Sequence, residues 1–283
     1  MRLSKSLYKQ FIRVIFYSFL IHTTFGCTSN QKPKEAETKK DDILELSIGT
    51  ISGPETDIME VIKDVAFEEH KIKLKIITFN DFMTPNIALE DGSIDANAYQ
   101  HLPYLQDAMN ARGFKFASIG QTFIYPVAAY SKKVAKGDEI SEQAKIAIPN
   151  DPTNEGRALL LLQKQGLIKL KDGVGLTALP SDIVENPKNL EIIEIEAAQL
   201  PRVLEDVDVA IINTVFAANA SLSPSKDSLF AEGSESPYAN IIAVREQDKK
   251  KDWTLKLLQA ANSPKVAEAA TRIFSGNAIP AWN

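Results

Sequence analysis

Apolar and polar residues alternate along the chain with two different periods. From Leu44, apolar side chains take every second position (LELSI), and Ile72–Phe79 repeats this pattern with two lysines between apolar residues. Between these runs, apolar residues recur every three to four positions from Ile58 to Ala66. A period of two is typical of a strand, and a period near 3.6 is typical of an amphipathic helix. The pattern therefore predicts a strand, a helix and a second strand.

The same alternation continues to the C-terminus. Helices are predicted over residues 82–90, 103–111, 154–165, 199–205, 253–261 and 264–274. Strands or extended runs are predicted over residues 94–99, 121–130, 145–149, 191–196, 207–213 and 238–245. Strands that alternate with helices predict an α/β fold with a largely parallel sheet.

A strand that runs into a helix through a polar turn is predicted in IAIPNDPTNEGRALLLLQ. Thr153 or Asn154 is expected to cap the start of the helix, and Gly166 to cap its end. The free N–H groups and the dipole at such a helix start favour an anion. Arg157, expected in the first turn, would hold a carboxylate or phosphate in its guanidinium fork. Alternatively, Arg157 lies on the surface or pairs with an acid such as Glu155.

Composition and charge are those of an ordinary globular chain. The 283 residues are 44% hydrophobic and 24% charged, which is enough for two lobes of roughly 100–150 residues each. The net charge of −5 gives no reason to expect a nucleic-acid partner. The single cysteine excludes an intrachain disulfide and a cysteine-based zinc site, and the histidines after it, His70 and His101, are too few for a histidine metal site. We expect neither a metal nor a cofactor.

The first 26 residues are typical of an export signal. A basic segment precedes the apolar run 14–21, which is too short to span a bilayer. Gly26 and Cys27 resemble the end of a bacterial lipobox, in which the cysteine is lipidated and becomes the mature N-terminus. Thr24 and Phe25 depart from the usual leucine and small residue. The alternative is a plain secretory signal in which the cysteine occurs by chance.

A polar segment separates this signal from the folded part. Residues 27–42 are rich in Lys, Glu and Thr and poor in apolar residues. Such a composition buries too little apolar surface to fold alone, so a flexible tether is predicted. Regular structure is expected from Ile43 onward.

Candidate binding residues follow the predicted strands. In open α/β sheets, ligands lie beyond the carboxyl ends of the strands. Rings, amides and one arginine occur there or at the start of the last extended run: Phe79, Tyr99, His101, Arg157, Asn213 and Asn240. A zwitterionic amino acid fits this set, because an arginine can take its carboxylate, amide oxygens can accept from its ammonium, and rings can line its side chain.

Each of these residues also has an ordinary structural role open to it. Phe79 and Tyr99 can be core residues, His101 can sit at a helix start, and Asn213 can cap the next helix. The chain contains no GxSxG, P-loop or GxGxxG motif. His101 could act as a base near Asp95 in sequence, but no serine or cysteine nucleophile is suggested beside them. Binding is therefore the preferred interpretation over catalysis.

Several longer segments carry a family resemblance. TFNDFMTPNIAL, DANAYQHLPYL, FIYPVAAYSKK, IPNDPTNEGRALLLLQKQGLIKLKDGVG, ENPKNLEIIEIEAAQLPR, AIINT and ESPYANIIAVRE resemble the methionine-binding lipoproteins of bacterial ABC importers, the NlpA/MetQ family. The resemblance covers nearly all of residues 43–282. It implies an α/β, two-lobed periplasmic-binding-protein fold with the ligand cleft between the lobes. The expected lobes are residues 43–127 with 237–283, and residues 128–236.

The resemblance also implies a ligand, partners and a location. The expected ligand is L-methionine, with D-methionine or a methionine dipeptide as alternatives. Rings would surround the thioether, the arginine would bind the carboxylate, and asparagines would hold the backbone polar groups. The implied site residues are Phe79, Tyr99, His101, Asn154, Arg157, Asn213 and Asn240. The protein would be lipid-anchored to the cell membrane, face the periplasm or exterior, and serve ABC permease and ATPase subunits without being an enzyme. A surface lipoprotein with an adhesive role is the alternative from another functional class.

Overall fold

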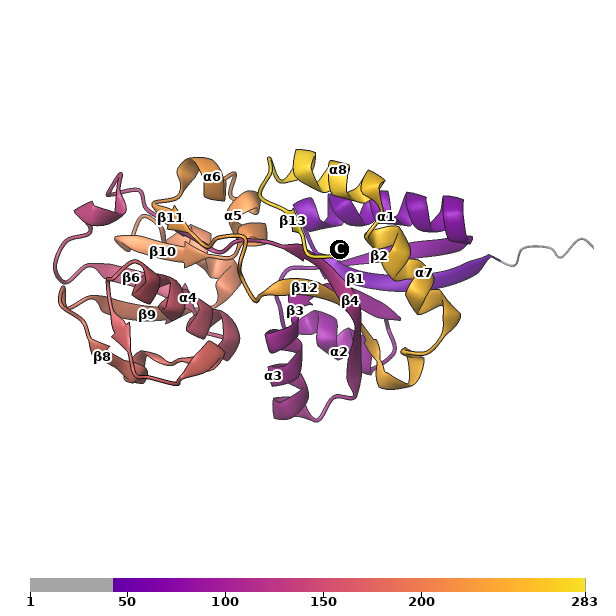
Figure 1. The fold of residues 1–283 in the computed structure, drawn as a ribbon, viewed down its shortest axis with the longest axis horizontal. Helices are drawn as coiled ribbons and strands as arrows, with labels where there is room; N and C mark the ends of the chain where they lie inside the picture. Colours follow the sequence, from indigo (N-terminus) through magenta and orange to yellow (C-terminus); the bar gives the residue numbers. More distant parts are fainter. Residues whose placement is uncertain (1–42, 283) are drawn as a thin grey trace, which may run out of the picture. The chain divides into compact units, whose positions relative to one another are not determined.

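Two large β-sheets with their helices, and one small two-stranded sheet, make up the part of the chain that the structure describes (Figure 1). The structure is a computed structural model, and it describes residues 43–282. The expected signal peptide, Cys27 and the tether of residues 27–42 lie outside the described residues.

The first sheet has six strands in the order β13-β4-β12-β3-β1-β2. Its strands are β1 (Leu44–Ile51), β2 (Ile72–Phe79), β3 (Ala96–His101), β4 (Phe116–Ile124), β12 (Ala239–Arg245) and β13 (Ile279–Pro280). Its helices are α1 (Pro54–His70), α2 (Thr84–Glu90), α3 (Leu102–Arg112), α7 (Asp252–Ala261) and α8 (Pro264–Ile273), with the 3₁₀ turn η5 (Glu246–Asp248). Helices α1, α7 and α8 share one core with this sheet, and α2 and α3 contribute to another.

The second sheet has five strands in the order β11-β5-β10-β6-β9. They are β5 (Ala128–Tyr130), β6 (Lys145–Pro149), β9 (Glu191–Ile195), β10 (Val209–Ile212) and β11 (Phe230–Ala231). The accompanying helices are α4 (Pro152–Lys164), α5 (Thr214–Asn219) and α6 (Pro224–Asp227). Strands β7 (Lys169–Leu170) and β8 (Ile183–Glu185) pair antiparallel in a separate small sheet. Short 3₁₀ turns complete this half: η1 (Gly137–Glu139), η2 (Gly175–Thr177), η3 (Pro180–Asp182) and η4 (Ala197–Val203).

Helix α1 follows its predicted apolar face. The helix begins at Pro54, where a proline is tolerated because the first N–H groups of a helix have no partner within it. The face predicted from periodicity is buried: Ile58, Met59, Ile62, Val65 and Ala66. Burial of a large aliphatic side chain stabilises the fold by about 1.5–3 kcal/mol. This face therefore holds α1 against the first sheet.

The sheets are mixed, so the prediction of a largely parallel sheet was wrong in part. Strands β1, β2 and β3 are parallel, as are β6, β9 and β10, but β12 runs antiparallel to both β3 and β4. The predicted single run over 121–130 is two strands in different sheets, β4 and β5. The chain passes from one sheet to the other in this region, and period-two alternation does not reveal which sheet a strand joins.

The helices and strands that the sequence pattern did not predict are short. Helix α5 has six residues, β7 and β13 have two each, and so they are too short for a periodic pattern. The helix predicted over 199–205 is the 3₁₀ segment η4, which contains Pro201, a residue that has no N–H to donate. None of the described helices has the length and apolar character needed to cross a membrane.

Candidate functional site

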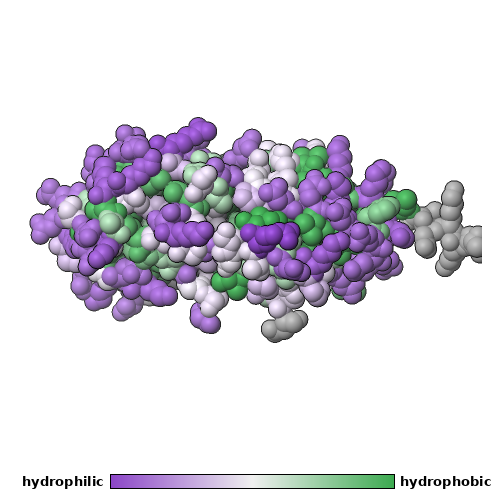
Figure 2. Space-filling model, turned by 90° about the horizontal axis from the view of Figure 1, so that it is seen from above, coloured by the Kyte–Doolittle hydropathy of each residue, from purple (hydrophilic) through white to green (hydrophobic). Residues whose placement is uncertain are grey.

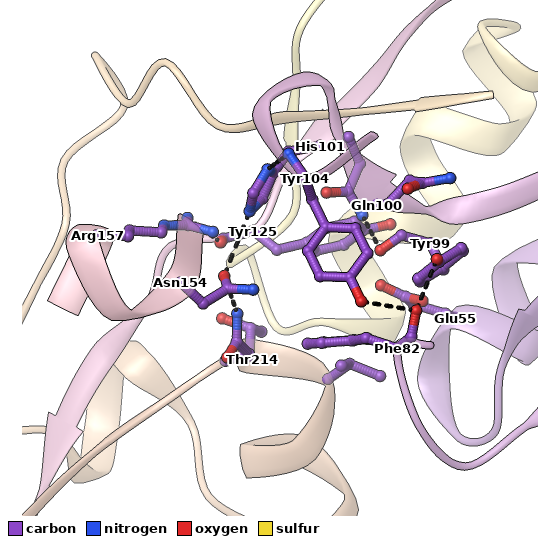
Figure 3. Close-up of a pocket in the computed structure, with 13 residues that line it drawn as sticks. Glu55, Phe82, Tyr99, Gln100, His101, Tyr104, Tyr125, Asn154, Arg157 and Thr214 are labelled. Carbon is purple, nitrogen blue, oxygen red and sulfur yellow. Dashed lines mark hydrogen bonds between the residues drawn. The ribbon is translucent and has the colours of Figure 1, made fainter. Parts of the chain in front are cut away.

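A cavity lies where the carboxyl ends of the parallel strands of both sheets come together (Figure 3). It contains about 390 Å³ of empty space, part of it open to solvent. Six of the seven predicted site residues line it: Tyr99, His101, Asn154, Arg157, Asn213 and Asn240. Asn240 reaches this place from the C-terminal part of the chain because β12 is antiparallel to β3, which pairs Asn240 with His101.

The start of α4 differs from its prediction. Asp151 is the N-cap, and its Oδ1 accepts a hydrogen bond from the N–H of Asn154 at 3.0 Å. The predicted caps, Thr153 and Asn154, therefore lie inside the helix. Arg157 falls in the second turn rather than the first, where the unfavourable effect of the helix dipole on a cation is smaller. Gly166 was predicted to cap the end of the helix; the C-cap is Gln165, and Gly166 follows it in a left-handed conformation at φ 70°.

A chain of amide hydrogen bonds orients the polar side chains. Both oxygens of Asp151 accept from Nδ2 of Asn154, at 3.0 Å each. This turns Oδ1 of Asn154 toward Asn213, whose Nδ2 donates to it at 2.8 Å. Oδ1 of Asn213 is buried and has no partner among the described residues. The site thus presents one free amide oxygen that can accept from a ligand.

His101 is held as a neutral imidazole. Its Nδ1 accepts from the N–H of Tyr104 at 3.1 Å, so the ring proton lies on Nε2, which donates to Oδ1 of Asn154 at 3.2 Å. Burial, together with the positive charge of Arg157, lowers the pKa of His101 to about 3. At neutral pH this histidine is therefore a fixed hydrogen-bond donor and not a cation.

This neutral histidine should make folding stability sensitive to acid. Because the folded-state pKa lies below the ordinary value of 6.5, unfolding takes up a proton as the pH falls from about 6.5 toward 3. His101→Gln should remove up to about 1.4 kcal/mol per pH unit from the slope of unfolding free energy in that window. Urea unfolding of parent and variant between pH 6.5 and 4 gives the difference. Equal slopes would contradict a buried neutral His101.

Arg157 has a partner that the sequence did not suggest. Its Nε donates to Oε1 of Glu232 at 2.8 Å, and its Nη2 donates to Oε2 of Glu232 and to the carbonyl of Tyr125. The ring of Tyr238 lies 4.5 Å from the guanidinium carbon. The alternative prediction that Arg157 pairs with Glu155 was wrong. Nη1 has no hydrogen-bond partner among the described residues, and Arg157 is one of the residues that line the cavity.

Phe79 does not line the cavity. It ends β2, is partly buried and packs against two hydrophobic core clusters, which is close to its alternative interpretation as a core residue. Phe82, three residues later, lines the cavity instead. The predicted helix begins two residues late, at Thr84, because Asp81 accepts hydrogen bonds from the N–H groups of Met83 and Thr84 and holds a turn there. Phe82 is therefore a loop residue and is free to face the cavity.

Two tyrosines fix Phe82 in place. The hydroxyls of Tyr99 and Tyr104 both donate to the carbonyl of Phe82, at 2.7 and 2.9 Å (Figure 3). The ring of Phe82 also lies 4.7 Å from that of Phe216 in the second half. These rings form an apolar wall on one side of the cavity. We call Phe82, Tyr99 and Tyr104 the aromatic wall.

The alternative structural roles turn out to be compatible with the site. His101 caps α3 through Nδ1 and still lines the cavity. Asn213 stands at the N-cap position of α5, but its side chain makes no capping hydrogen bond and bonds to Asn154 instead. Asp95 lies at the other end of β3, where it binds Ser47 and does not approach His101.

The remaining lining residues were not predicted. Tyr125 follows β4, Thr214 and Val215 come from the unpredicted α5, and Gln100 lies in a buried amide network. Glu55, the second residue of α1, also lines the cavity. A glutamate directly after the first strand was the available signal for this last residue. Among residues 43–282, no group of three or more His, Cys, Asp or Glu side chains converges as a metal site.

Comparisons with known proteins agree on one family. The family model described as NlpA lipoprotein matches residues 46–282. D-methionine-binding lipoprotein MetQ of Salmonella typhimurium is 48% identical over 91% of this chain and 92% of its own. A periplasmic substrate-binding protein of an ABC transporter from Coxiella burnetii has a TM-score of 0.81 and 53% identity, covering 83% of this chain and all of that one. A nutrient-binding protein from Burkholderia cenocepacia, solved with methionine bound, has a TM-score of 0.82 and 48% identity, covering 84% and 100%.

Proposed function

The chain belongs to the NlpA lipoprotein family and has its two-lobed binding-protein fold, and from this premise we propose that it is the methionine-binding lipoprotein of an ABC importer. One observation carries the ligand class: a cavity that combines an arginine N–H and a free amide oxygen with an aromatic wall. An α-amino acid with an apolar side chain has matching groups.

In this proposal each part of the ligand meets a defined group. The carboxylate approaches Nη1 of Arg157, and the ammonium donates to the free Oδ1 of Asn213, with Asn240 beside it. The thioether lies against the aromatic wall, where each sulfur–aromatic contact is worth about 0.3–1.5 kcal/mol. L-methionine is our expected ligand, and D-methionine and a methionine dipeptide are the competitors to test.

We also propose that the two sheets belong to lobes that close on the ligand. Residues 43–127 with 237–283 would form one lobe and residues 128–236 the other, joined by two extended crossings. Site residues come from both: His101 and Asn240 from the first sheet, Asn154 and Asn213 from the second half. Binding groups on both sides of a cleft favour the closed form once ligand is present.

The test is binding by the purified protein. Native mass spectrometry should detect methionine carried through purification, and calorimetric titration of ligand-free protein should give saturable binding of L-methionine. D-methionine, glycyl-methionine and alanine are the comparison ligands. Small-angle scattering should show a smaller radius of gyration with methionine. Binding of none of these ligands by verified ligand-free protein would refute the proposed function.

Binding without turnover is part of the proposal. The cavity has a neutral imidazole but no serine or cysteine among its lining residues. Methionine incubated with the protein should be recovered unchanged by NMR. Conversion to any product would support an enzyme on the same fold instead.

The lipid anchor and the transporter are proposed from the family and from the sequence before residue 43. The mature chain would begin at a lipidated Cys27, hold the binding domain at the cell membrane through a tether, and deliver methionine to permease and ATPase subunits. Deletion of the gene should then reduce methionine uptake. Unchanged uptake with intact binding would favour the adhesive alternative.

Cys27→Ser should release the protein from membranes. A lipid chain stabilises membrane binding by about 0.8 kcal/mol per buried CH₂, and serine cannot carry the thioether-linked lipid. Fractionation of cells that express parent and variant gives the readout, and mass spectrometry of the mature parent locates its first residue. Membrane association of the serine variant, or a mature N-terminus elsewhere, would contradict the anchor.

A further inference from the structure

Glu55 is a buried carboxyl group at the ligand cavity. It is the second residue of α1, and because α1 starts directly beyond the carboxyl end of β1, its first turn lies at the cavity. Only 6% of Glu55 is exposed, and its Oε2 is buried without a hydrogen-bond partner among the described residues. A buried, unpartnered carboxyl oxygen costs free energy, so its presence at a binding cavity needs an explanation.

The surroundings of Glu55 are largely apolar and provide no positive charge to balance a negative charge on its carboxyl group. A second, more apolar cavity lies behind it and is lined by Ile58, Met59, Ile62 and Phe123, among others. Burial in this place raises the pKa of Glu55 to about 8. The carboxyl group is therefore mostly protonated at neutral pH when the cavity holds no cation.

None of the other titratable groups that line the cavity supplies a free positive charge that could pair with the Glu55 carboxylate. Tyr99 and Tyr125 are buried, and burial raises the pKa of each well above its ordinary value. His101 is neutral, and Arg157 is paired with Glu232. No unpaired cationic side chain is therefore found among the described residues that line the cavity.

We propose that Glu55 binds the ammonium group of the amino-acid ligand as a carboxylate and gives up its proton when that ligand binds. This inference rests on the proposed function and names the counter-charge of its ligand. The protonated carboxyl loses its proton to the solvent, and the resulting carboxylate accepts a hydrogen bond from the ammonium. No other group is consumed or formed.

The placement of the two charged groups supports this assignment. Arg157 and Glu55 lie on opposite sides of the cavity (Figure 3). An α-amino acid carries its carboxylate and ammonium on one tetrahedral carbon, so a carboxylate directed at Arg157 leaves the ammonium pointing to a different part of the cavity wall. An ammonium has three N–H donors, and the amide oxygen of Asn213 satisfies one of them without any charge. A carboxylate supplies the charge that a neutral amide cannot.

The helix supports the ionised form once the ligand has arrived. Glu55 lies in the first turn of the 17-residue helix α1, where unpaired N–H groups and the helix dipole favour an anion. This contribution alone does not ionise Glu55, since burial dominates its pKa in the ligand-free cavity. The ligand's ammonium provides the missing attraction.

Proton release on binding is the most direct test, and it needs no variant. Methionine is titrated calorimetrically at pH 7 in buffers that differ in ionisation enthalpy. With a pKa of about 8, Glu55 should release close to one proton per methionine bound. Glu55→Gln keeps the shape of the side chain and should release none. It should also bind methionine at least about tenfold more weakly.

Two controls separate this effect from others. Asp57→Asn removes a charge from the same helix turn at an exposed position, and should match the parent in affinity and proton release. 4-(Methylthio)butanoate, which is methionine without its ammonium, should release no proton and should bind parent and Glu55→Gln about equally.

The outcomes are distinct. If the parent binds methionine without proton release and Glu55→Gln stays within about threefold of its affinity, this inference fails while the proposed function stands. If the parent binds no methionine, both fail. If Glu55→Gln weakens methionine and the des-amino analogue equally, Glu55 acts on cavity shape and the assignment to the ammonium is wrong.

Figure 2 shows the surface from one side, where apolar residues occur in small groups among polar ones. The large exposed apolar side chains are scattered over several elements, among them Met83, Val184 and Leu255. Isolated apolar residues of this kind are common on protein surfaces.

Discussion

Arg157→Ala should weaken methionine binding by about 30-fold to several thousandfold. Arg157 lines the cavity, its Nη1 has no hydrogen-bond partner among the described residues, and the proposed ligand presents its carboxylate to this nitrogen. Loss of one partner of a buried charge pair costs roughly 2–5 kcal/mol, which converts to that range of affinity. Because the carboxylate is common to all α-amino acids, alanine binding should weaken as much as methionine binding.

A second consequence of Arg157→Ala must be kept apart from the first. The variant also leaves the largely buried Glu232, whose side chain is 12% exposed, without its cationic partner, and this destabilises the folded protein. The double variant Arg157→Ala/Glu232→Gln removes that unpaired charge. It should recover part of the folding stability in urea unfolding, yet still bind methionine weakly. Glu232→Gln alone keeps the arginine and should retain most of the affinity.

Lysine should not restore this site. Arg157→Lys keeps the positive charge, but an ammonium cannot bind Glu232, the Tyr125 carbonyl and a ligand with the planar geometry of a guanidinium. Calorimetric titration of all variants with methionine and alanine provides the measurement. The carboxylate assignment is wrong if Arg157→Ala binds methionine within about threefold of the parent, which is under 1 kcal/mol.

Phe82→Ala should weaken methionine binding by about 10- to 100-fold and change alanine binding much less. The ring belongs to the aromatic wall and would cover the thioether side chain, which alanine lacks. Burial of a large apolar group is worth about 1.5–3 kcal/mol, and a sulfur–aromatic contact adds about 0.3–1.5 kcal/mol. Reorganisation of the two tyrosines around the gap would offset part of this sum.

Phe79→Ala is the matched control for this variant. Phe79 is three residues earlier, is also a phenylalanine, and packs into the core without lining the cavity. It should lower the unfolding temperature but leave the ratio of methionine to alanine affinity near that of the parent. The opposite result, in which Phe79→Ala loses methionine selectivity and Phe82→Ala keeps it, would contradict this assignment. It would mean that Phe79, the residue first predicted, contacts the ligand side chain.

Much of the fold follows from short-range patterns. Strands β2 and β6 have the predicted bounds, and α1 buries the predicted face. Side chains on one strand or helix are spaced by a fixed geometry, so a period in the sequence reports directly on one buried face. The patterns could not assign β4 and β5 to different sheets, because strand pairing depends on residues far away in the chain.

Part of the cavity lining also follows from local position. His101, Arg157 and Asn213 are near strand ends, and the carboxyl ends of parallel strands meet at one edge. Phe79 was predicted from the same rule, but it ends β2 outside the cavity lining, and the turn that Asp81 holds beyond it brings Phe82 to the cavity instead. A one-residue change along a strand reverses the direction of its side chain, so strand ends alone cannot choose the ring.

The sequence alone was sufficient for the order of the long elements, for their buried faces and for five cavity residues, because these depend on spacing within one strand or helix and on where strands begin or end. The family resemblance added Asn154. Only the folded chain revealed that Arg157 pairs with Glu232, 75 residues later, and that Glu55 is buried at the cavity without a partner. Those properties arise where segments distant in sequence exclude water from the same space. Burial and charge pairing there depend on every packed neighbour, and no single segment encodes them.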